Sequence, residues 1–598
     1  MPAPSQLIAA CAAAVLSVAF AAGPATPTAS NSYLVHNLVS DLPSMADYED
    51  PNLVNPWGLA TTASSPFWLG NNGTGTSTLY GTTGAPVALV VTVPSPSGPT
   101  GGAVSGVIAN TTTSFTVATG KAASFIFCTE DGTVSGWNSS VNATAAIVTV
   151  DNSKANSVFK GCAIGGTSTA PVLYVTDFHN GVVDMFDGTF KPITPAAGAF
   201  TDSGIPAGFA PFNVMNFGGK IFVTYAQQDA EQHDDVAGAG NGFVDVFDGS
   251  GSLLTRLVAR GALNSPWGMQ MAPATFGKFS GALLVGNFGD GTINAFDPTT
   301  GTQLGTLQDP TGHPLTVMGL WGLLFGNGGR GGDPSTLYFT AGIPGPYGED
   351  NESHGLFGSI QAPPAFTTAV NGASFQASLA PNTWASIIGG GLATTSRSWA
   401  ITDFSGANLP TVINGVSVTV NGAPAAIDYV GPSQIDFLVP ANAATGTAQI
   451  QVNNNDQISA AASVNLSAAA PAFFWFTGNK YIAATHADGA LAGPTTLIAG
   501  VTTPVMPGET VVLYGTGFGT TSPAPPNNAT FPAALALPTL PTVTIGGAPA
   551  IVTYGGLIEP GVFQINVVVP VSLPAGDAAV VATIGGQQSQ ANAFLSVL

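Results

Sequence analysis

The chain has 598 residues, and its 32 acidic and 11 basic side chains give a net charge of −21. It contains no cluster of Lys or Arg that could neutralise a run of phosphates, which argues against nucleic acid as a partner. Only 7% of the residues are charged, 45% are hydrophobic, and Gly (76) and Pro (46) are abundant. This composition is typical of many short strands and tight turns, and the hydrophobic content argues against a wholly disordered chain.

Residues 1–22 are predicted to be a cleaved signal peptide. The run from Leu7 to Ala22 is apolar, too short to span a bilayer comfortably, and followed by Gly-Pro-Ala-Thr-Pro-Thr. A lipoprotein signal at Cys11 is the weaker alternative, because too little apolar sequence precedes that cysteine. No later segment is long and apolar enough for a membrane span. We therefore expect a secreted protein, either extracellular or periplasmic.

A hairpin pattern recurs along residues 33–360. Its clearest copies are Leu173–Phe190 and Leu283–Asp297, each an apolar strand, a turn rich in Asn, Asp and Gly, and a second strand that reaches Phe-Asp. Repeats of about this length predict a β-propeller, here with six blades. The segment Tyr33–Val39 has no hairpin partner, and we expect it to supply the outer strand of the last blade and close the ring. The six repeat units cover about 55–93, 122–150, 158–193, 210–258, 265–308 and 319–360.

A second recurrent element, Pro-Trp-Gly or Leu-Trp-Gly, precedes several of these hairpins. It contains Trp57, Trp267 and Trp321, and Ala210–Asn213 is a weaker copy. We expect it at the start of each innermost strand, where Gly lets the backbone approach the propeller axis. The three tryptophans are candidate ligand-binding residues that could form an aromatic platform for a sugar, although packing between blades is the simpler interpretation.

The first domain resembles known propellers. The pattern Leu-Tyr-Val-x-Asp-x-x-x-Gly-x-Val that begins at Leu173 is similar to NHL-type repeats, although the Arg usual in that motif is absent. The stretches 37–43, 50–59 and 72–80 resemble a functionally uncharacterised family of secreted bacterial proteins. The resemblance implies the fold of 33–360 and no activity.

A linker at 361–370 is expected to lead to two Ig-like domains, 371–470 and 471–598. Val416–Val430 parallels Pro541–Gly555, which indicates an imperfect duplication of a seven-stranded sandwich. The order of motifs resembles the IPT/TIG class of Ig-like domains. The whole 371–598 block resembles the Solibacter-type C-terminal module, which implies a general appendage. The predicted fold class is therefore all-β: a six-bladed β-propeller followed by two tandem Ig-like β-sandwiches.

The sequence contains no recognisable catalytic motif: Gly-x-Ser-x-Gly, His-Glu-x-x-His, a phosphate-binding glycine loop and Cys-x-x-Cys are all absent. Beyond the signal segment, Cys128 and Cys162 are the remaining cysteines. In an oxidising compartment they form either a disulfide between adjacent blades or two buried free thiols, and both alternatives stay open.

Two acidic insertions, 227–235 and 347–355, are the candidate site. By repeat equivalence they should emerge on the same face of the ring, where His233 and His354 would be candidate ligand-binding residues. Carboxylates of this kind are the oxygen ligands that Ca²⁺ prefers, although solvated acidic loops are the simpler interpretation. The candidate metal ligands are Asp229, Glu231, Asp234, Asp235, Glu349, Asp350 and Glu352.

The sequence thus favours a non-enzymatic interaction protein. Its propeller face would bind an extracellular carbohydrate or protein, and the Ig-like pair would act as a spacer or surface-association unit. The alternative is a metal-dependent propeller hydrolase or lyase that acts on a lactone, ester or polysaccharide, with Ca²⁺ as the candidate cofactor.

Overall fold

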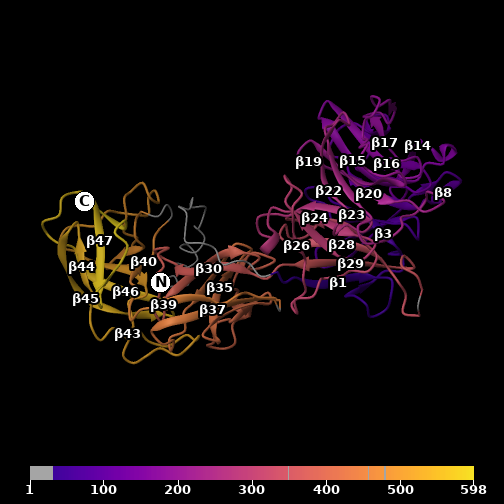
Figure 1. Cartoon of the computed structure of the whole chain (residues 1–598). Helices are drawn as coiled ribbons and strands as arrows, with labels where there is room; N and C mark the ends of the chain where they lie inside the picture. Colours follow the sequence, from indigo (N-terminus) through magenta and orange to yellow (C-terminus); the bar gives the residue numbers. More distant parts are fainter. Residues whose placement is uncertain (1–30, 348, 456, 477–479) are drawn as a thin grey trace. The chain divides into compact units, whose positions relative to one another are not determined.

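The computed structural model describes residues 31–598 apart from 348, 456 and 477–479, so the predicted signal peptide at 1–22 lies outside the described residues. Strands make up almost all of the regular structure, with short 3-10 turns at Ser153–Ala155, Gly277–Phe279 and Ile401–Asp403. Among the described residues, no helix has the length and apolar character needed to cross a membrane. The chain divides into two compact units, Ser30–Ala362 and a second unit that contains Pro363–Leu598 (Figure 1).

The first unit is a β-propeller of six blades, each with four antiparallel strands, and the last blade carries a short additional strand. The first three blades are β3 (Pro56–Ala60), β4 (Phe67–Asn71), β5 (Thr76–Tyr80) and β6 (Pro86–Thr92); β9 (Val104–Ala109), β12 (Phe125–Thr129), β13 (Thr133–Trp137) and β14 (Ile147–Asp151); and β15 (Phe159–Thr167), β16 (Ala170–Asp177), β17 (Val182–Asp187) and β18 (Pro192–Ile193). The small hairpins β7 (Pro94–Ser95) with β8 (Gly98–Gly101), and β10 (Thr116–Ala118) with β11 (Lys121–Ala122), lie outside the blades.

The remaining blades follow the same order. They are β19 (Phe209–Phe217), β20 (Lys220–Gln227), β21 (Phe243–Phe247) and β22 (Leu253–Ala259); β23 (Pro266–Met271), β24 (Leu283–Asn287), β25 (Ile293–Phe296) and β26 (Gln303–Thr306); and β27 (Leu320–Phe325), β28 (Leu337–Ile343), β29 (His354–Gln361), β1 (Leu34–Ser40) and β2 (Tyr48–Glu49). The first strands of successive blades contact one another from β3 through β27 and back to β3, so they surround the propeller axis.

Strand β1 closes the ring, as the sequence predicts. It pairs antiparallel with β29, with Val35 opposite Ile360 and Ser40 opposite Leu356. The second blade differs from its predicted extent, because its innermost strand begins at Val104 and not near 122. Val104-Ser105-Gly106 lacks the aromatic residue that marks the other innermost strands, so the repeat pattern does not reveal it.

The two cysteines pack between the second and third blades. Cys128 on β12 and Cys162 on β15 belong to one buried apolar cluster, and the structure holds both as free thiols. Both lie beside Gly106, where a Cβ atom would be 2.8 Å from Cys162 Sγ and 3.5 Å from Cys128 Cβ. Burial, and then the contact with Cys162, raises the pKa of the Cys128 thiol well above its usual value. The disulfide between blades stays a prediction.

The second unit contains two sandwiches of the same topology. The first has β30 (Ala365–Asn371), β31 (Trp384–Gly390), β32 (Arg397–Ser398), β33 (Val412–Ile413), β34 (Val416–Val420), β35 (Ala423–Val430), β36 (Gln434–Leu438), β37 (Gly446–Asn454), β38 (Gln457–Ile458) and β39 (Ala462–Leu466). The second has β40 (Ala472–Phe473), β41 (Ala484–His486), β42 (Thr510–Thr516), β43 (Leu535–Ala536), β44 (Thr542–Ile545), β45 (Ala548–Glu559), β46 (Val562–Val568), β47 (Gly576–Ile584), β48 (Gln587–Gln588) and β49 (Phe594–Val597). The sheet orders β30-β31-β36-β35-β34-β37-β38 and β40-β42-β46-β45-β44-β47-β48 correspond strand by strand.

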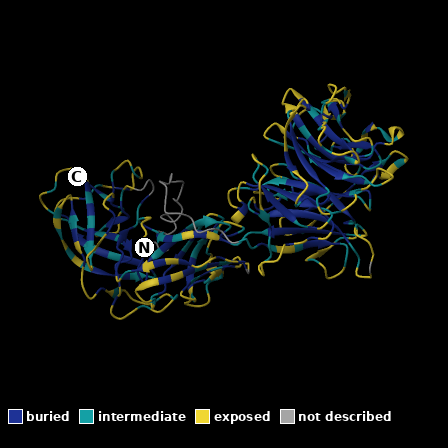
Figure 2. Cartoon of the chain, in the orientation of Figure 1, coloured by how far each residue is buried: buried dark blue, intermediate teal, exposed yellow. Residues whose placement is uncertain are grey.

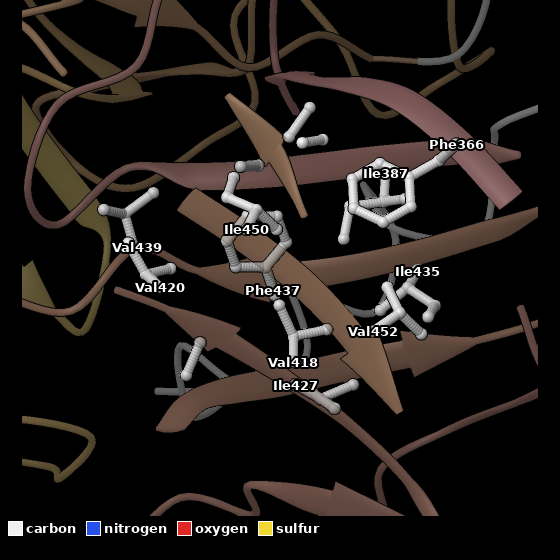
Figure 3. Close-up of a cluster of buried hydrophobic side chains, with 14 of the residues drawn as sticks. Phe366, Ile387, Val418, Val420, Ile427, Ile435, Phe437, Val439, Ile450 and Val452 are labelled. Atoms are coloured by element: carbon white, nitrogen blue, oxygen red, sulfur yellow. The ribbon is translucent and has the colours of Figure 1, made fainter. Parts of the chain in front are cut away.

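Alternating apolar residues of these strands form the sandwich cores. Figure 3 shows the first core, where Val418, Ile427, Phe437 and Ile450 point toward one another from β34, β35, β36 and β37. Strand β30 occupies most of the segment predicted as a linker, because its apolar residues pair with β31 and enter this core. Figure 2 shows the same division in both units, with buried residues along the strands and exposed residues at the turns.

The two sandwiches are joined by specific contacts. The indole nitrogen of Trp384 donates to the carbonyl of Pro560 at 2.9 Å, and its backbone nitrogen donates to Thr516 Oγ1 at 2.9 Å. Asn528 from the second sandwich accepts a hydrogen bond from the backbone nitrogen of Ala426 at 3.2 Å. These contacts explain why the two sandwiches form one compact unit.

Candidate functional site

Aromatic side chains meet on the propeller axis. Trp57, Trp267 and Trp321 each occupy a β-bulge near the start of an innermost strand, and a bulge changes the direction in which a side chain points. The rings of Trp57 and Trp321 stack with centroids 3.5 Å apart, and Trp267 meets both edge-on at 6.1 and 5.8 Å. Phe288 stacks on Trp321 at 4.0 Å. The tryptophans therefore pack against one another, and they do not form an open platform.

Lys160 occupies the corresponding position of the third blade. Phe159-Lys160-Gly161 replaces the Pro-Trp-Gly sequence, with the same bulge between residues 159 and 162. The lysine side chain is only 1% exposed, and its Nζ lies 5.0 Å from the centroid of the Trp57 ring. A buried ammonium group needs charged partners, because removing it from water is costly.

Two carboxylates supply these partners. Glu130, in the turn between β12 and β13, contacts Lys160 Nζ directly, and Asp234 Oδ1 lies 3.2 Å from the same atom. Burial acts to lower the pKa of Lys160, but the attraction of Glu130 and Asp234 outweighs it and the pKa is raised. The hydrogen bond from His233 at 3.0 Å, together with Lys160, holds the pKa of Asp234 well below its usual value. Lys160 is therefore a charged anchor for the 227–235 insertion.

The two acidic insertions meet at one cavity of about 570 Å³. Trp57 and Trp321, whose side chains lie on the axis, also line it, so the cavity lies at the mouth of the propeller channel. The prediction that both insertions emerge on one face of the ring is therefore correct. The lining residues are Trp57, Asp234, Asp235, Phe288, Met318, Trp321, Pro344, Glu349, Asp350, Asn351 and Glu352.

Two carboxyl groups of the cavity are shifted toward protonation. Burial, followed by repulsion from Glu130, raises the pKa of Glu352 to about 8. Burial also raises the pKa of Asp235 to about 6, although the neighbouring Ser265 hydroxyl and then Lys160 oppose this shift. Glu352 has a φ of 77° and its Oε2 lies 3.4 Å from Asn55 Nδ2, so an unusual backbone conformation places this carboxyl group in the cavity.

Two buried polar atoms of the lining residues have no partner. Among the described residues, nothing hydrogen-bonds to the indole nitrogen of Trp57, and the Ser265 hydroxyl beside Asp235 does not reach hydrogen-bond geometry with Oδ2 of that carboxylate. An unpaired buried donor or acceptor costs about 1–3 kcal/mol, so a ligand that paired with both would recover this free energy. The Trp57 side chain is only 2% exposed, and its N–H is therefore fixed in direction.

Several predicted residues lie outside this cavity. His354 pairs with Asp41 at 2.6 Å, and neither it nor Trp267 is among the described residues that line the cavity. Asp229 accepts a hydrogen bond from the backbone nitrogen of His233 at 2.8 Å, and it therefore shapes the loop. Glu231 is exposed in the same loop.

Five of the seven predicted calcium ligands line the cavity, but among the described residues only Asp234 of these belongs to a group of closely spaced ligand atoms. Glu130, His233 and Asp234 place their ligand atoms within 4.8 Å of one another. However, Lys160 binds Glu130 Oε1 and Asp234 Oδ1, so a divalent cation there would have to displace or tolerate an ammonium group. The donor set therefore does not fit Ca²⁺ as it stands.

Sequence reasoning missed Glu130 and Lys160. A signal for Lys160 was present, because a charged residue stands where three other blades have tryptophan, in a chain with only 11 Lys and Arg residues. Glu130 gave no comparable signal, since acidic residues are common in hairpin turns and its contact with Lys160 spans 30 positions.

Comparisons with known proteins place these features in context. The IPT/TIG domain family matches residues 400–468, within the first sandwich. Two uncharacterized proteins of Acanthamoeba polyphaga mimivirus, R648 and L690, are 32% and 31% identical to the chain. The first match spans 344 residues, 56% of this chain and 81% of R648. The second spans 341 residues, 55% of this chain and 86% of L690.

Solved propeller structures show more distant likeness. A streptogramin B lyase matches with a TM-score of 0.32 and 10% identity, over 55% of this chain and 97% of the lyase. A glucose dehydrogenase matches with a TM-score of 0.33 and 13% identity, over 55% of this chain and 98% of the dehydrogenase. At these TM-scores neither likeness carries an argument about the function of this chain.

Proposed function

Because the chain belongs to the same family as the mimivirus proteins R648 and L690, both uncharacterized, we propose its function from its own cavity: the propeller is a binding protein for a small ligand. The ligand enters the cavity at the mouth of the channel. The volume, about 570 Å³, falls within the range of small-molecule sites. The observation that carries the proposal is the pair of unpaired buried atoms, Trp57 Nε1 and Asp235 Oδ2, in residues that line this cavity.

The proposal includes the setting of the protein. It is exported after cleavage of residues 1–22, and the IPT/TIG-type sandwiches hold the propeller away from a surface. Support comes from the apolar run Leu7–Ala22 and from the resemblance of 371–598 to C-terminal modules of exported proteins. The resemblance of the propeller to NHL-type repeats, and of the whole chain to bacterial proteins, rests on sequence motifs alone, and the two relatives named above are viral.

A thermal-shift screen of the full chain tests the binding role. The panel contains neutral sugars, amino sugars, amines, carboxylates and divalent metal ions. We expect at least one compound to raise the Tm of the wild-type chain, because a ligand that binds only the folded state stabilises it. Met318 is 59% exposed at the cavity, and Met318→Trp should abolish that shift by narrowing the mouth.

Met45→Trp is the matched control, since Met45 is 41% exposed in a separate hollow on the last blade. The shift should persist in this variant. A shift that survives Met318→Trp would place binding elsewhere on the molecule, and the absence of any shift would overturn the proposal.

Acid–base catalysis is a second candidate, favoured by one observation. Glu352 and Asp235 line the same cavity with pKa values raised to about 8 and about 6, so one carboxyl is protonated at neutral pH while the other is mostly ionised. Such separated pairs can act as general acid and general base without a metal. For any compound that binds, NMR should then show turnover that Glu352→Gln abolishes while binding is retained.

A further inference from the structure

We infer that the cavity recognises an amino sugar, through a protonated amine, a neighbouring hydroxyl oxygen and an apolar ring face. This inference rests on the proposed binding role and specifies its ligand. Three properties of the cavity carry it: an excess of negative charge, one donor and one acceptor without partners, and an apolar wall.

The charge of the cavity favours a cationic ligand. Five of its described lining residues are acidic and none is basic: Asp234, Asp235, Glu349, Asp350 and Glu352. Lys160 lies beneath this set and is already paired with Glu130 and Asp234. Among the described residues, neither Asp235 nor Glu352 forms an ion pair with Lys160. An ammonium group beside the mostly ionised Asp235 would form a charge-assisted hydrogen bond, with the protonated Glu352 as a neutral neighbour.

The two unpaired atoms require that the ligand carry a hydrogen-bond donor and an acceptor in addition to a positive charge. Asp235 Oδ2 needs a donor, which an ammonium group supplies. The indole N–H of Trp57 needs an acceptor oxygen, which a hydroxyl group supplies. A metal ion would satisfy the carboxylates but leave the indole N–H unpaired, and a neutral sugar would satisfy the indole but leave the charges uncompensated.

The apolar wall fits the face of a sugar ring. Met318 is exposed, and Phe288 is half-buried with one face stacked on Trp321. Both residues line the cavity with the acidic side chains. Carbon-bound hydrogens on one face of a sugar can pack against such residues, while its polar groups turn to the opposite wall.

Isothermal titration calorimetry of the full chain at pH 7 tests the inference. D-glucosamine is the probe, and D-glucose and N-acetyl-D-glucosamine are matched ligands without the charged amine. We expect glucosamine to bind at least about ten-fold more tightly than either neutral sugar. A β-1,4-linked glucosamine trimer tests whether the ligand is a free amino sugar or one unit of a polysaccharide. Tighter binding of the trimer than of glucosamine indicates an amino polysaccharide, and equal binding indicates a free sugar.

Three variants locate the interaction. Asp235→Asn should weaken glucosamine binding about ten-fold, because it removes the charge and half of the acceptor capacity. Trp57→Phe removes the indole N–H and should weaken glucosamine and glucose alike. Glu231→Gln removes the same charge from an exposed position of the same insertion and should leave binding unchanged. If Trp57→Phe does not fold, Asp235→Asn and Glu231→Gln carry the test alone.

Four results would overturn the amino-sugar inference, and they differ in what they mean for the proposed binding role. Glucose binding as tight as glucosamine binding would overturn the inference but leave the binding role standing. A Met318-dependent shift with a different compound, without glucosamine binding, would do the same. Binding of Ca²⁺ that Asp234→Asn abolishes would replace the amino sugar with a metal ion. If no compound binds, both the inference and the proposed function fail.

Discussion

Asp245 lies in the middle of β21 with a fully buried side chain. Burial, and then repulsion from Asp202, raises the pKa of its carboxyl group to about 7. The corresponding residue of the next blade, Asn294 on β25, is also buried and donates a hydrogen bond to the carbonyl of Ala262 at 3.1 Å. The next blade therefore shows that a neutral amide side chain is accommodated at this buried position.

Asp245→Asn should stabilise the propeller more at pH 8 than at pH 5. The folded-state pKa is raised above the unfolded value, so the stabilising effect of the protonated carboxyl is lost progressively between the unfolded pKa, about 4, and the folded pKa, about 7. Asparagine avoids this loss, and we expect the free energy of unfolding at pH 8 to rise by about 1–2 kcal/mol. Urea denaturation at both pH values measures the effect. Glu231→Gln, an exposed change of the same charge, should show no such difference, and an equal gain at both pH values would contradict the explanation.

The duplicated sandwiches offer a second comparison between equivalent residues. Burial raises the pKa of Asp428 to about 7, with repulsion from Asp436 as the next cause, and burial also raises the pKa of Asp436. The equivalent positions in the second sandwich are Thr553 and Asn566. The side chain of Asn566 accepts from Gln564 Nε2 at 2.8 Å, just as Asp436 accepts from Gln434 Nε2 at 2.9 Å.

Asp436→Asn should raise the thermal transition of the second unit more at pH 8 than at pH 5. The amide keeps the oxygen that accepts from Ser386 and Gln434, and it removes the charge that repels Asp428. Burial raises the folded-state pKa of both carboxyls, so their protonated forms stabilise the fold at low pH. This stabilisation is lost as the pH rises toward the folded-state pKa, about 7 for Asp428, and the benefit of the amide grows over the same range. Calorimetry at the two pH values measures it, and a lower Tm at pH 8 would show that the charge itself is needed.

At the scale of elements, the innermost strands determine which positions must be glycine. A Cβ atom at Gly322 would lie 2.6 Å from the carbonyl oxygen of Trp57, and one at Gly268 would lie 2.5 Å from that of Trp321. The obstacle in both cases is the backbone of the neighbouring innermost strand. The expectation that glycine lets the backbone approach the axis is therefore correct, and the close approach lies between successive first strands.

Gly322→Ala should destabilise the propeller by about 2 kcal/mol or more, because the neighbouring backbone has to move. Gly98 in β8 is the matched control, since a Cβ atom there would meet nothing within 4 Å. Gly98→Ala should change the free energy of unfolding by less than about 0.5 kcal/mol. Denaturant unfolding compares the two variants, and equal effects would contradict the role assigned to the axis.

At the scale of the whole molecule, closure of the ring by β1 and the division of the chain into two units together predict the effect of an N-terminal deletion. Deletion of residues 1–40 removes β1, which pairs with β29 and whose Ser40 donates to the carbonyl of Gly355 at 2.7 Å. We expect the thermal transition of Ser30–Ala362 to fall sharply, because the last blade then loses its outer strand and exposes an edge. The transition of Pro363–Leu598 should stay unchanged, since it belongs to a separate compact unit. Scanning calorimetry resolves the two transitions, and a joint decrease would show that the units are coupled.

Local patterns were sufficient to predict most of the fold. Repeated hairpins, Trp-Gly sequences and the duplicated strands of 371–598 reveal blades and sandwiches, because each unit repeats the same alternation of buried and exposed residues. The pattern fails at β9, where Val104-Ser105-Gly106 has no aromatic marker, and at 361–370, where β30 looks like a linker.

The sequence by itself determined the class of fold, the face on which the two acidic insertions emerge and the acidic character of the chain. Only the tertiary structure decided which of those residues act together. Lys160 and Glu130 come from the third and second blades, so the packing of these neighbouring blades brings their charges into contact. The hydrogen bond from His233 lowers the pKa of Asp234, whereas burial raises those of Asp235 and Glu352. Burial also leaves the Trp57 N–H without a partner among the described residues. Such effects depend on distances across the ring and on exclusion of water, and neither is encoded in the local order of residues.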